Sequence, residues 1–204
     1  MLKRSLSLSI AAGTFISIGG AVFLSSENSV VGAVLFSVAL LSICCLQLFL
    51  FTGKVGFLVL DHSAKATAEV ALTLLGNFIS TCIGGLMVSA AKPKLMEAAQ
   101  LRCIPRLEMN VAAVLITAFF CGILMSTAVA IYKEKGSSLG IFFCVPVFIL
   151  SGFEHSIADM FYFFCARMFS LEVFVFLALV VVGNSVGGMF IPALRMLAEE
   201  KKNG

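Results

Sequence analysis

Three ionisable side chains lie within one apolar stretch of the chain, SGFEHSIADMFYFF at residues 151–164. His155 and Asp159 are four residues apart and would share a helix face, whereas Glu154 would point about 100° away. Ionisable groups are costly inside a membrane span, where a histidine typically marks a solute or proton pathway. We therefore interpret His155 as a pathway residue. Glu154 and Asp159 could instead be structural hydrogen-bond acceptors.

Lys54 is another ionisable residue in an apolar run, within LFTGKVG at residues 50–56. A cation facing a pathway would raise the local concentration of small anions. Two structural alternatives stay open, because the side chain could extend to the membrane interface or pair with Glu154 or Asp159.

A metal site is a competing use of His155 and Asp159, as in an intramembrane metalloenzyme. Three protein ligands are normally needed, and the only other histidine, His62, falls in a polar loop. The seven cysteines include no CxxC pair, so we expect buried free thiols. No nucleophile elbow, phosphate loop or dinucleotide-binding glycine pattern occurs where it could act. The sequence therefore predicts neither an enzyme nor a cofactor.

The composition places these residues in a membrane protein. The chain has 204 residues, of which 60% are hydrophobic and 12% charged, and its mean hydropathy is +1.09. A soluble domain is nearer half apolar and a quarter charged, so we expect repeated membrane spans in a single domain covering residues 1–204. The net charge of +3 is scattered and gives no nucleic-acid signal.

Six hydrophobic segments follow one another along the chain, at residues 6–24, 30–60, 66–90, 109–132, 139–166 and 171–197. The second is interrupted by LFTGKVG, and the fifth contains Pro146 and the pair Ser151-Gly152 just before Glu154. Backbone groups freed at membrane depth must be buried in protein or line a wet cavity. Two broken helices, one in each half, predict a solute site near the bilayer midplane.

The two halves of the chain also echo each other. LGNFISTCIGG at residues 75–85 resembles VGNSVGG at residues 182–188, and the two Gly-Asn pairs are about 107 residues apart. A small-residue pair, Gly13 and Ser17, recurs about 109 residues later as Gly122 and Ser126. A repeat of three spans that follows an odd number of crossings must be inverted in the membrane, which is typical of transporters.

Basic residues favour cytoplasmic termini. The first apolar run follows Lys3 and Arg4 as in a signal peptide, but no small-residue cleavage site follows it, so we expect a mature helix. With a cytoplasmic amino terminus, eight basic residues lie inside and five outside, as the positive-inside rule favours. The inside set is Lys3, Arg4, Lys65, Lys133, Lys135, Arg195, Lys201 and Lys202, and the outside set is Lys92, Lys94, Arg102, Arg106 and Arg167.

Four of these motifs together resemble one known family. SGFEHSIADMF is similar to the fifth-helix signature of formate/nitrite transporters, which usually reads SGFEHS-x-A-N-M. LFTGK resembles the family's Leu-Phe-Thr loop, VGNSVGG its sixth-helix Gly-Asn motif, and AAGTFISIG its first helix. The similarity covers nearly the whole chain. It implies an aquaporin-like protomer of six helices, assembled as a homopentamer with one pore per subunit.

The resemblance also implies roles for single residues. His155 matches the central pore histidine, Glu154 its supporting glutamate and Asn184 the amide of the last helix. The loop facing the histidine corresponds to Leu50, Phe51 and Thr52, and the apolar constrictions correspond to Phe36, Leu40, Val129 and Phe148.

Three positions depart from the family pattern. Asn110 stands where members usually carry a buried lysine near the start of the fourth span, so Lys54 would supply that charge from a different wall. Ser126 stands where an asparagine is common. Asp159 replaces the usual asparagine, and a charged Asp159 beside His155 would stabilise the imidazolium form.

The sequence thus predicts a multi-pass protein of the plasma or inner membrane that conducts small monovalent weak-acid anions such as formate or nitrite, proton-linked through His155. Its expected partners are small inorganic or carboxylate anions, lipid and further copies of itself. Hydrosulfide, acetate and lactate are alternative substrates for the same fold, and the metalloenzyme is the alternative from another class.

Overall fold

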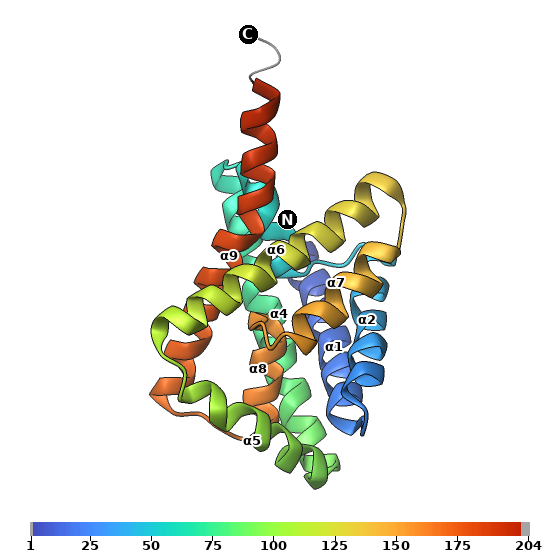
Figure 1. Cartoon of the computed structure of the whole chain (residues 1–204), viewed down its shortest axis with the longest axis vertical. Helices are drawn as coiled ribbons and strands as arrows, with labels where there is room; N and C mark the ends of the chain where they lie inside the picture. Colours follow the sequence, from blue (N-terminus) through green and yellow to red (C-terminus); the bar gives the residue numbers. More distant parts are fainter. Residues whose placement is uncertain (1, 201–204) are drawn as a thin grey trace.

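The computed structural model describes residues 2–200, which form helices joined by short loops, with no strand among them (Figure 1). Four helices in this part are long and apolar enough to cross a membrane: α1 (Leu2–Ser25), α4 (Ala64–Ala91), α6 (Val111–Lys135) and α9 (Leu171–Glu200). The shorter elements are α2 (Ser29–Cys45), α3 (Phe51–Lys54), the 3-10 helix η1 (Val55–Val59), α5 (Pro93–Leu107), α7 (Leu139–Leu150) and α8 (Ser156–Cys165). The all-helical prediction is confirmed here; Lys201 and Lys202 lie outside the described residues.

The second apolar segment turns earlier than the sequence predicts. Helix α2 ends at Cys45, the backbone reverses at Gln47 with a φ of 54°, and α3 begins at Phe51. The predicted interruption around Gly53 instead lies inside α3 and η1. Local glycines therefore do not set this turn, which is stabilised by hydrogen bonds from another helix.

The fifth apolar segment contains two helices. Helix α7 ends at Leu150, and α8 begins at Ser156 after a loop of residues 151–155. Gly152 has a φ of 66° in this loop, a conformation that favours glycine. Pro146 does not end α7 but lies within it.

Helix α5 was not predicted, because its residues are too polar to form a span. Pro93 occupies the first helical turn, where proline is well tolerated. Leu95, Ala99 and Cys103 follow at intervals of four and are buried on one face. The helix is therefore amphipathic, and it lies at the opposite end of the molecule from the start of α1 and the end of α9 (Figure 1).

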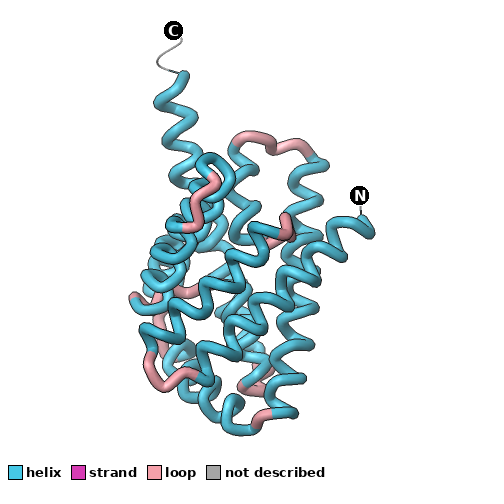
Figure 2. Tube along the Cα trace, turned by 90° about the vertical axis from the view of Figure 1, so that its right-hand side faces the viewer, coloured by secondary structure: helices cyan, strands magenta, loops and turns pink. Residues whose placement is uncertain are grey.

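Small residues allow the long helices to pack closely in pairs, α1 with α4 and α6 with α9. A Cβ at Gly13 would meet the backbone oxygen of Asn77, and a Cβ at Gly122 would meet that of Asn184. Small residues at such crossings let backbones approach in membrane proteins. The two close crossings bring both Gly-Asn motifs against a neighbouring helix. Figure 2 shows that only short loops interrupt the helical trace.

The outer surface carries many apolar side chains. At least half of the surface is exposed in residues from five different helices: Ile18, Val38, Met87, Phe143 and Val182. Monomeric soluble proteins rarely expose contiguous apolar patches of more than a few hundred Å². This surface suits lipid or a neighbouring subunit.

Candidate functional site

Two cavities approach each other inside the helix bundle. The Arg106 cavity, of about 410 Å³, is lined by Arg102, Arg106, Phe148, Glu154, His155, Asp159 and neighbouring residues. The Lys54 cavity, of about 480 Å³, is lined by Arg4, Leu50, Lys54, Val129, Lys133 and neighbouring residues. Among the described residues, the two linings have no member in common.

A buried hydrogen bond joins the walls of these cavities. His155 Nε2 lies 2.9 Å from Thr52 Oγ1, and both residues are at most 1% exposed. Thr52 belongs to α3, whose neighbouring residues line the Lys54 cavity, whereas His155 lines the Arg106 cavity. The pair therefore stands between the two cavities, as expected for the histidine and its facing loop.

His155 is also the N-cap of α8. The backbone N–H of Ala158 donates to His155 Nδ1 at 3.1 Å, which satisfies one of the free donors at the helix start. An acceptor nitrogen carries no proton, so the neutral ring has its proton on Nε2 and donates it to Thr52. Phe148 stacks on the ring, with centroids 5.4 Å apart. These contacts fix the orientation of the imidazole.

Apolar side chains surround the histidine. Phe36 meets Phe148 edge to face with ring centroids 6.3 Å apart, and Leu40 is 1% exposed. Leu50 and Phe51 are buried at the start of α3. Val129 packs against Gly53, where an added Cβ would lie 3.0 Å from its methyl group. Phe36 and Phe148 thus reach the histidine through ring contacts, and Val129 contacts the residue after Thr52.

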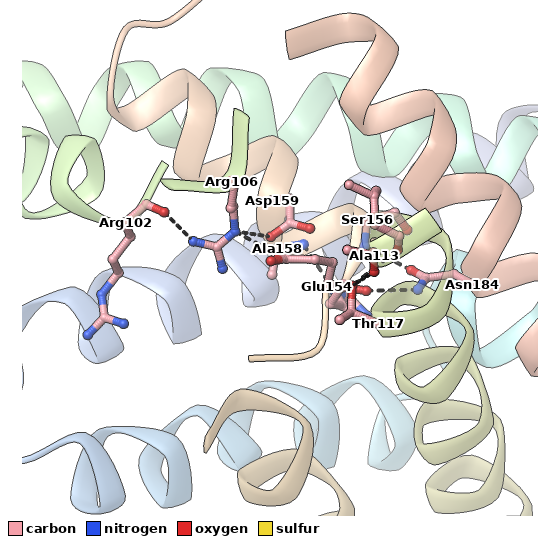
Figure 3. Close-up of polar contacts among 11 residues, drawn as sticks. Arg102, Arg106, Ala113, Thr117, Glu154, Ser156, Ala158, Asp159 and Asn184 are labelled. Atoms are coloured by element: carbon pink, nitrogen blue, oxygen red, sulfur yellow. Dashed lines mark hydrogen bonds and ion pairs between the residues drawn. The ribbon is translucent and has the colours of Figure 1, made fainter. Parts of the chain in front are cut away.

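Arg106 is a cation that lines the same cavity as the histidine, and the sequence did not single it out. Its Nε lies 2.7 Å from Glu154 Oε2 and 3.6 Å from Asp159 Oδ1, and its Nη1 donates to the backbone oxygen of Arg102 (Figure 3). Asp159 therefore faces Arg106 and not the imidazole, which corrects the expectation that it pairs with His155. The i, i+4 spacing of Arg102 and Arg106 in a polar segment was the available signal.

Burial and the carboxylates of Asp159 and Glu154 have opposite effects on the pKa of Arg106. Burial alone would lower its pKa, but Asp159 and Glu154 outweigh that effect, and the pKa of Arg106 is raised above its ordinary value. Cys103, one turn earlier on α5, is buried, and burial raises the pKa of this thiol to about 12. The guanidinium is thus charged and the thiol neutral near pH 7.

Lys54 lies in the other cavity and has a different partner from those expected. Its Nζ is 2.9 Å from Glu69 Oε2 and 3.4 Å from the centre of the Phe49 ring. Pairing with Glu154 or Asp159 is therefore wrong, because these carboxylates line the Arg106 cavity. The two cations stand in separate cavities, one with Glu69 and the other with Glu154.

Two buried asparagines hold the starts of α3 and α8 in the same way. Asn77 Oδ1 accepts from the N–H of Phe51 at 2.8 Å, and its Nδ2 donates to the backbone oxygens of Ser9 and Phe49 at 2.8 and 2.9 Å. Asn184 Oδ1 accepts from the N–H of Ser156 at 2.8 Å, and its Nδ2 donates to the backbone oxygens of Ala118 and Glu154 at 2.8 and 2.9 Å (Figure 3). Each amide thus bridges the two sides of a helix interruption to a long helix.

The remaining expected site residues lie elsewhere. Asn110 is exposed and caps α6, accepting from the N–H of Ala113 at 2.9 Å. Ser126 donates to the backbone oxygen of Ile123 and faces Gly56. Neither lines the Arg106 or the Lys54 cavity.

Metal ligands do not converge in the described part of the chain, where no group of three or more His, Cys, Asp or Glu side chains could hold an ion. All seven cysteines are free; Cys103 is buried and Cys45 is exposed.

Comparisons with known proteins identify solved structures with a similar fold and a matching family. A solved structure described as "Pentameric formate channel with formate bound" is 21% identical, superposes with a TM-score of 0.83 and aligns over 97% of each chain. Another, described as "FNT family ion channel", is also 21% identical, with a TM-score of 0.82 over 95% of this chain and 89% of that one. A search of curated protein sequences found no match. The family model of formate/nitrite transporters matches residues 2–198, so the chain belongs to the formate/nitrite transporter family, a family of transporters and not of enzymes.

Proposed function

We propose that this protein is a membrane channel or transporter for small monovalent weak-acid anions such as formate or nitrite, with proton-linked passage centred on His155. The observation that carries the proposal is the hydrogen bond between His155 and Thr52, which separates two cavities that each contain basic side chains. The structural likeness to a channel described with formate bound supports the choice of substrate class.

The energetics favour coupling to a proton. A bare carboxylate in an apolar constriction loses hydration worth several kcal/mol even after relaxation. If formate has an aspartate-like pKa of ~3.9, protonating it at pH 7 costs about 4 kcal/mol. Protonation thus costs no more than the hydration that the bare anion would lose, so the neutral acid can pass a constriction formed by Phe36, Leu40 and Phe148. His155 donates a hydrogen bond or a proton at the centre of this constriction.

The proposed architecture has six spans in two inverted three-helix repeats, with the second span made of α2 and α3 and the fifth of α7 and α8. The matching hydrogen bonds of Asn77 and Asn184 support this assignment, because each asparagine comes from the third span of its half. The protomers would form a homopentamer in the plasma or inner membrane. The end that carries the start of α1 and the end of α9 would be cytoplasmic, with the Lys54 cavity on that side.

The test is uptake of radiolabelled formate or nitrite into vesicles that contain the purified protein, with and without an imposed pH gradient. We expect uptake that increases when the outside is more acidic, and competition by unlabelled formate. Acetate, lactate and hydrosulfide as competitors decide among the alternative substrates. Flux that ignores the pH gradient would refute proton linkage, and no flux of any of these anions would refute the function.

A further inference from the structure

The Arg106 cavity contains more negative than positive charge in its central cluster. Glu154 and Asp159 both face the Nε of Arg106, which has a single hydrogen to donate. Glu154 takes that hydrogen at 2.7 Å, whereas 3.6 Å to Asp159 Oδ1 is too long for a hydrogen bond. One guanidinium therefore balances one carboxylate, and Asp159 is left without a hydrogen-bonded countercharge.

One oxygen of Asp159 has no partner at all. Asp159 is 1% exposed, and Oδ2 and the neighbouring Ser156 Oγ are the buried side-chain atoms without a hydrogen-bond partner among the described residues. An ionised carboxylate buried without partners is strongly unfavourable, whereas a protonated one is a hydroxyl donor. The geometry therefore points to a proton on this residue.

Arg106 is the only positively charged side chain among the described groups that lie close to Asp159. Arg106 and Cys103 face it from α5, Glu154 from the preceding loop, Cys121 from α6 and Tyr162 from its own helix. Arg102 lines the same cavity, and its guanidinium lies 4.2 Å from the centre of the Phe23 ring. Only Arg106 in this close set is a cation, and Glu154 already neutralises it.

We propose that Asp159 carries a proton in the empty Arg106 cavity and transfers it to a weak-acid anion that enters there. The inference rests on the proposed function and names the proton donor for it. The O–H bond of Asp159 breaks and a new O–H bond forms on an oxygen of the anion, which leaves an Asp159 carboxylate and a neutral acid. Asp159 regains a proton from water on its own side, and the acid releases its proton to water in the Lys54 cavity. One anion and one proton cross together.

Asp159 fits this role better than its neighbours do. Both ring nitrogens of His155 are engaged, one with Ala158 and the other with Thr52. Glu154 accepts the hydrogen bond from the Nε of Arg106. Asp159 alone combines a place in the cavity wall with a free oxygen, and its transfer leaves the Thr52–His155 contact intact.

The test compares Asp159→Asn with Asp61→Asn, a matched change in an exposed loop, in vesicles of purified protein. Asparagine keeps the shape of the side chain but has no proton to transfer. We expect formate uptake driven by a pH gradient to fall at least tenfold in Asp159→Asn, to be unchanged in Asp61→Asn, and to recover in part in Asp159→Glu. Wild-type dependence on the pH gradient in Asp159→Asn would overturn the proposal.

A second measurement is independent of transport and of the variant's yield. Infrared spectra of the wild-type protein near pH 7 should contain the carbonyl band of a protonated carboxyl group, shifted in deuterium oxide and missing in Asp159→Asn. Absence of that band from the wild type would overturn the proposal. No anion flux in the wild type with the band present would instead refute the proposed function and leave the proton on Asp159 established.

Discussion

Replacing either Asn77 or Asn184 by leucine should destabilise the fold by a similar, predictable amount. Leucine has a branched shape similar to that of asparagine but removes three hydrogen bonds in each case. Both asparagines are 0% exposed, so water cannot replace the amide as the hydrogen-bond partner of these backbone groups. Each change leaves one N–H and one loop carbonyl oxygen unsatisfied at a helix interruption. It also removes a second hydrogen bond from a carbonyl oxygen inside α1 or α6, which still accepts its helical N–H.

The magnitude follows from the number of bonds lost. Hydrogen bonds inside membrane proteins average about 0.6 kcal/mol in double-mutant cycles, which sets a lower bound of about 2 kcal/mol for three. Leaving a buried group unpaired costs about 1–3 kcal/mol, which raises the expected loss toward about 6 kcal/mol for the two groups left without any partner.

The assay is reversible unfolding of the purified protein in mixed micelles with an increasing fraction of denaturing detergent. The unfolding free energies of Asn77→Leu and Asn184→Leu should each fall by about 2–6 kcal/mol and agree with each other within about 1 kcal/mol. Ser185→Ala, a substitution next to Asn184 on α9, is the control and should change little. A loss below about 1 kcal/mol in either leucine variant, or a large difference between the two, would refute the equivalence of the two bridges.

Four further substitutions test the pathway and its packing. His155→Phe should abolish formate flux or its dependence on pH, because it removes the contact with Thr52 and the cap of α8; wild-type flux would make His155 structural. Lys54→Met should weaken apparent formate affinity on the Lys54 side and Glu69→Gln should strengthen it, since the two groups neutralise each other; unchanged transport kinetics in both would contradict this. Gly56→Ala should destabilise the protein by about 1–3 kcal/mol in the same unfolding assay, because a Cβ would lie 2.6 Å from the backbone oxygen of Gly188.

The fold could be predicted from the sequence where nearby residues determine the backbone conformation. Apolar runs predicted the four long helices, and Gly152 marked the loop before α8 because its φ of 66° favours glycine. The turn before α3 gave no such signal. Gln47 adopts a φ of 54° there, and the loop is stabilised by Asn77, 26 residues beyond Phe51. A turn fixed by a distant amide leaves no local pattern to detect.

The site was accessible only in part for the same reason. The spacing of Glu154, His155 and Asp159 indicated chemistry, and the structure places all three beside one cavity. Their cation was missed because Arg106 belongs to a polar segment whose helix carries no hydrophobic span. Hydropathy identifies apolar spans but not which polar loop helix lines a cavity between them.

Lys54 and Arg106 each form an ion pair with a glutamate, and these ion pairs change how the proposed pathway can attract an anion. A carboxylate within 3 Å of each cation cancels most of its field, since opposite unit charges 4 Å apart interact by about 4 kcal/mol near a protein surface. Each pair therefore orients its carboxylate more than it attracts substrate. Arg102 lines the Arg106 cavity, and Arg4 and Lys133 line the Lys54 cavity. These three side chains contact aromatic rings and form no ion pair among the described residues. Long-range attraction must then come from these three side chains, and the paired cations act at short range, after the anion has entered.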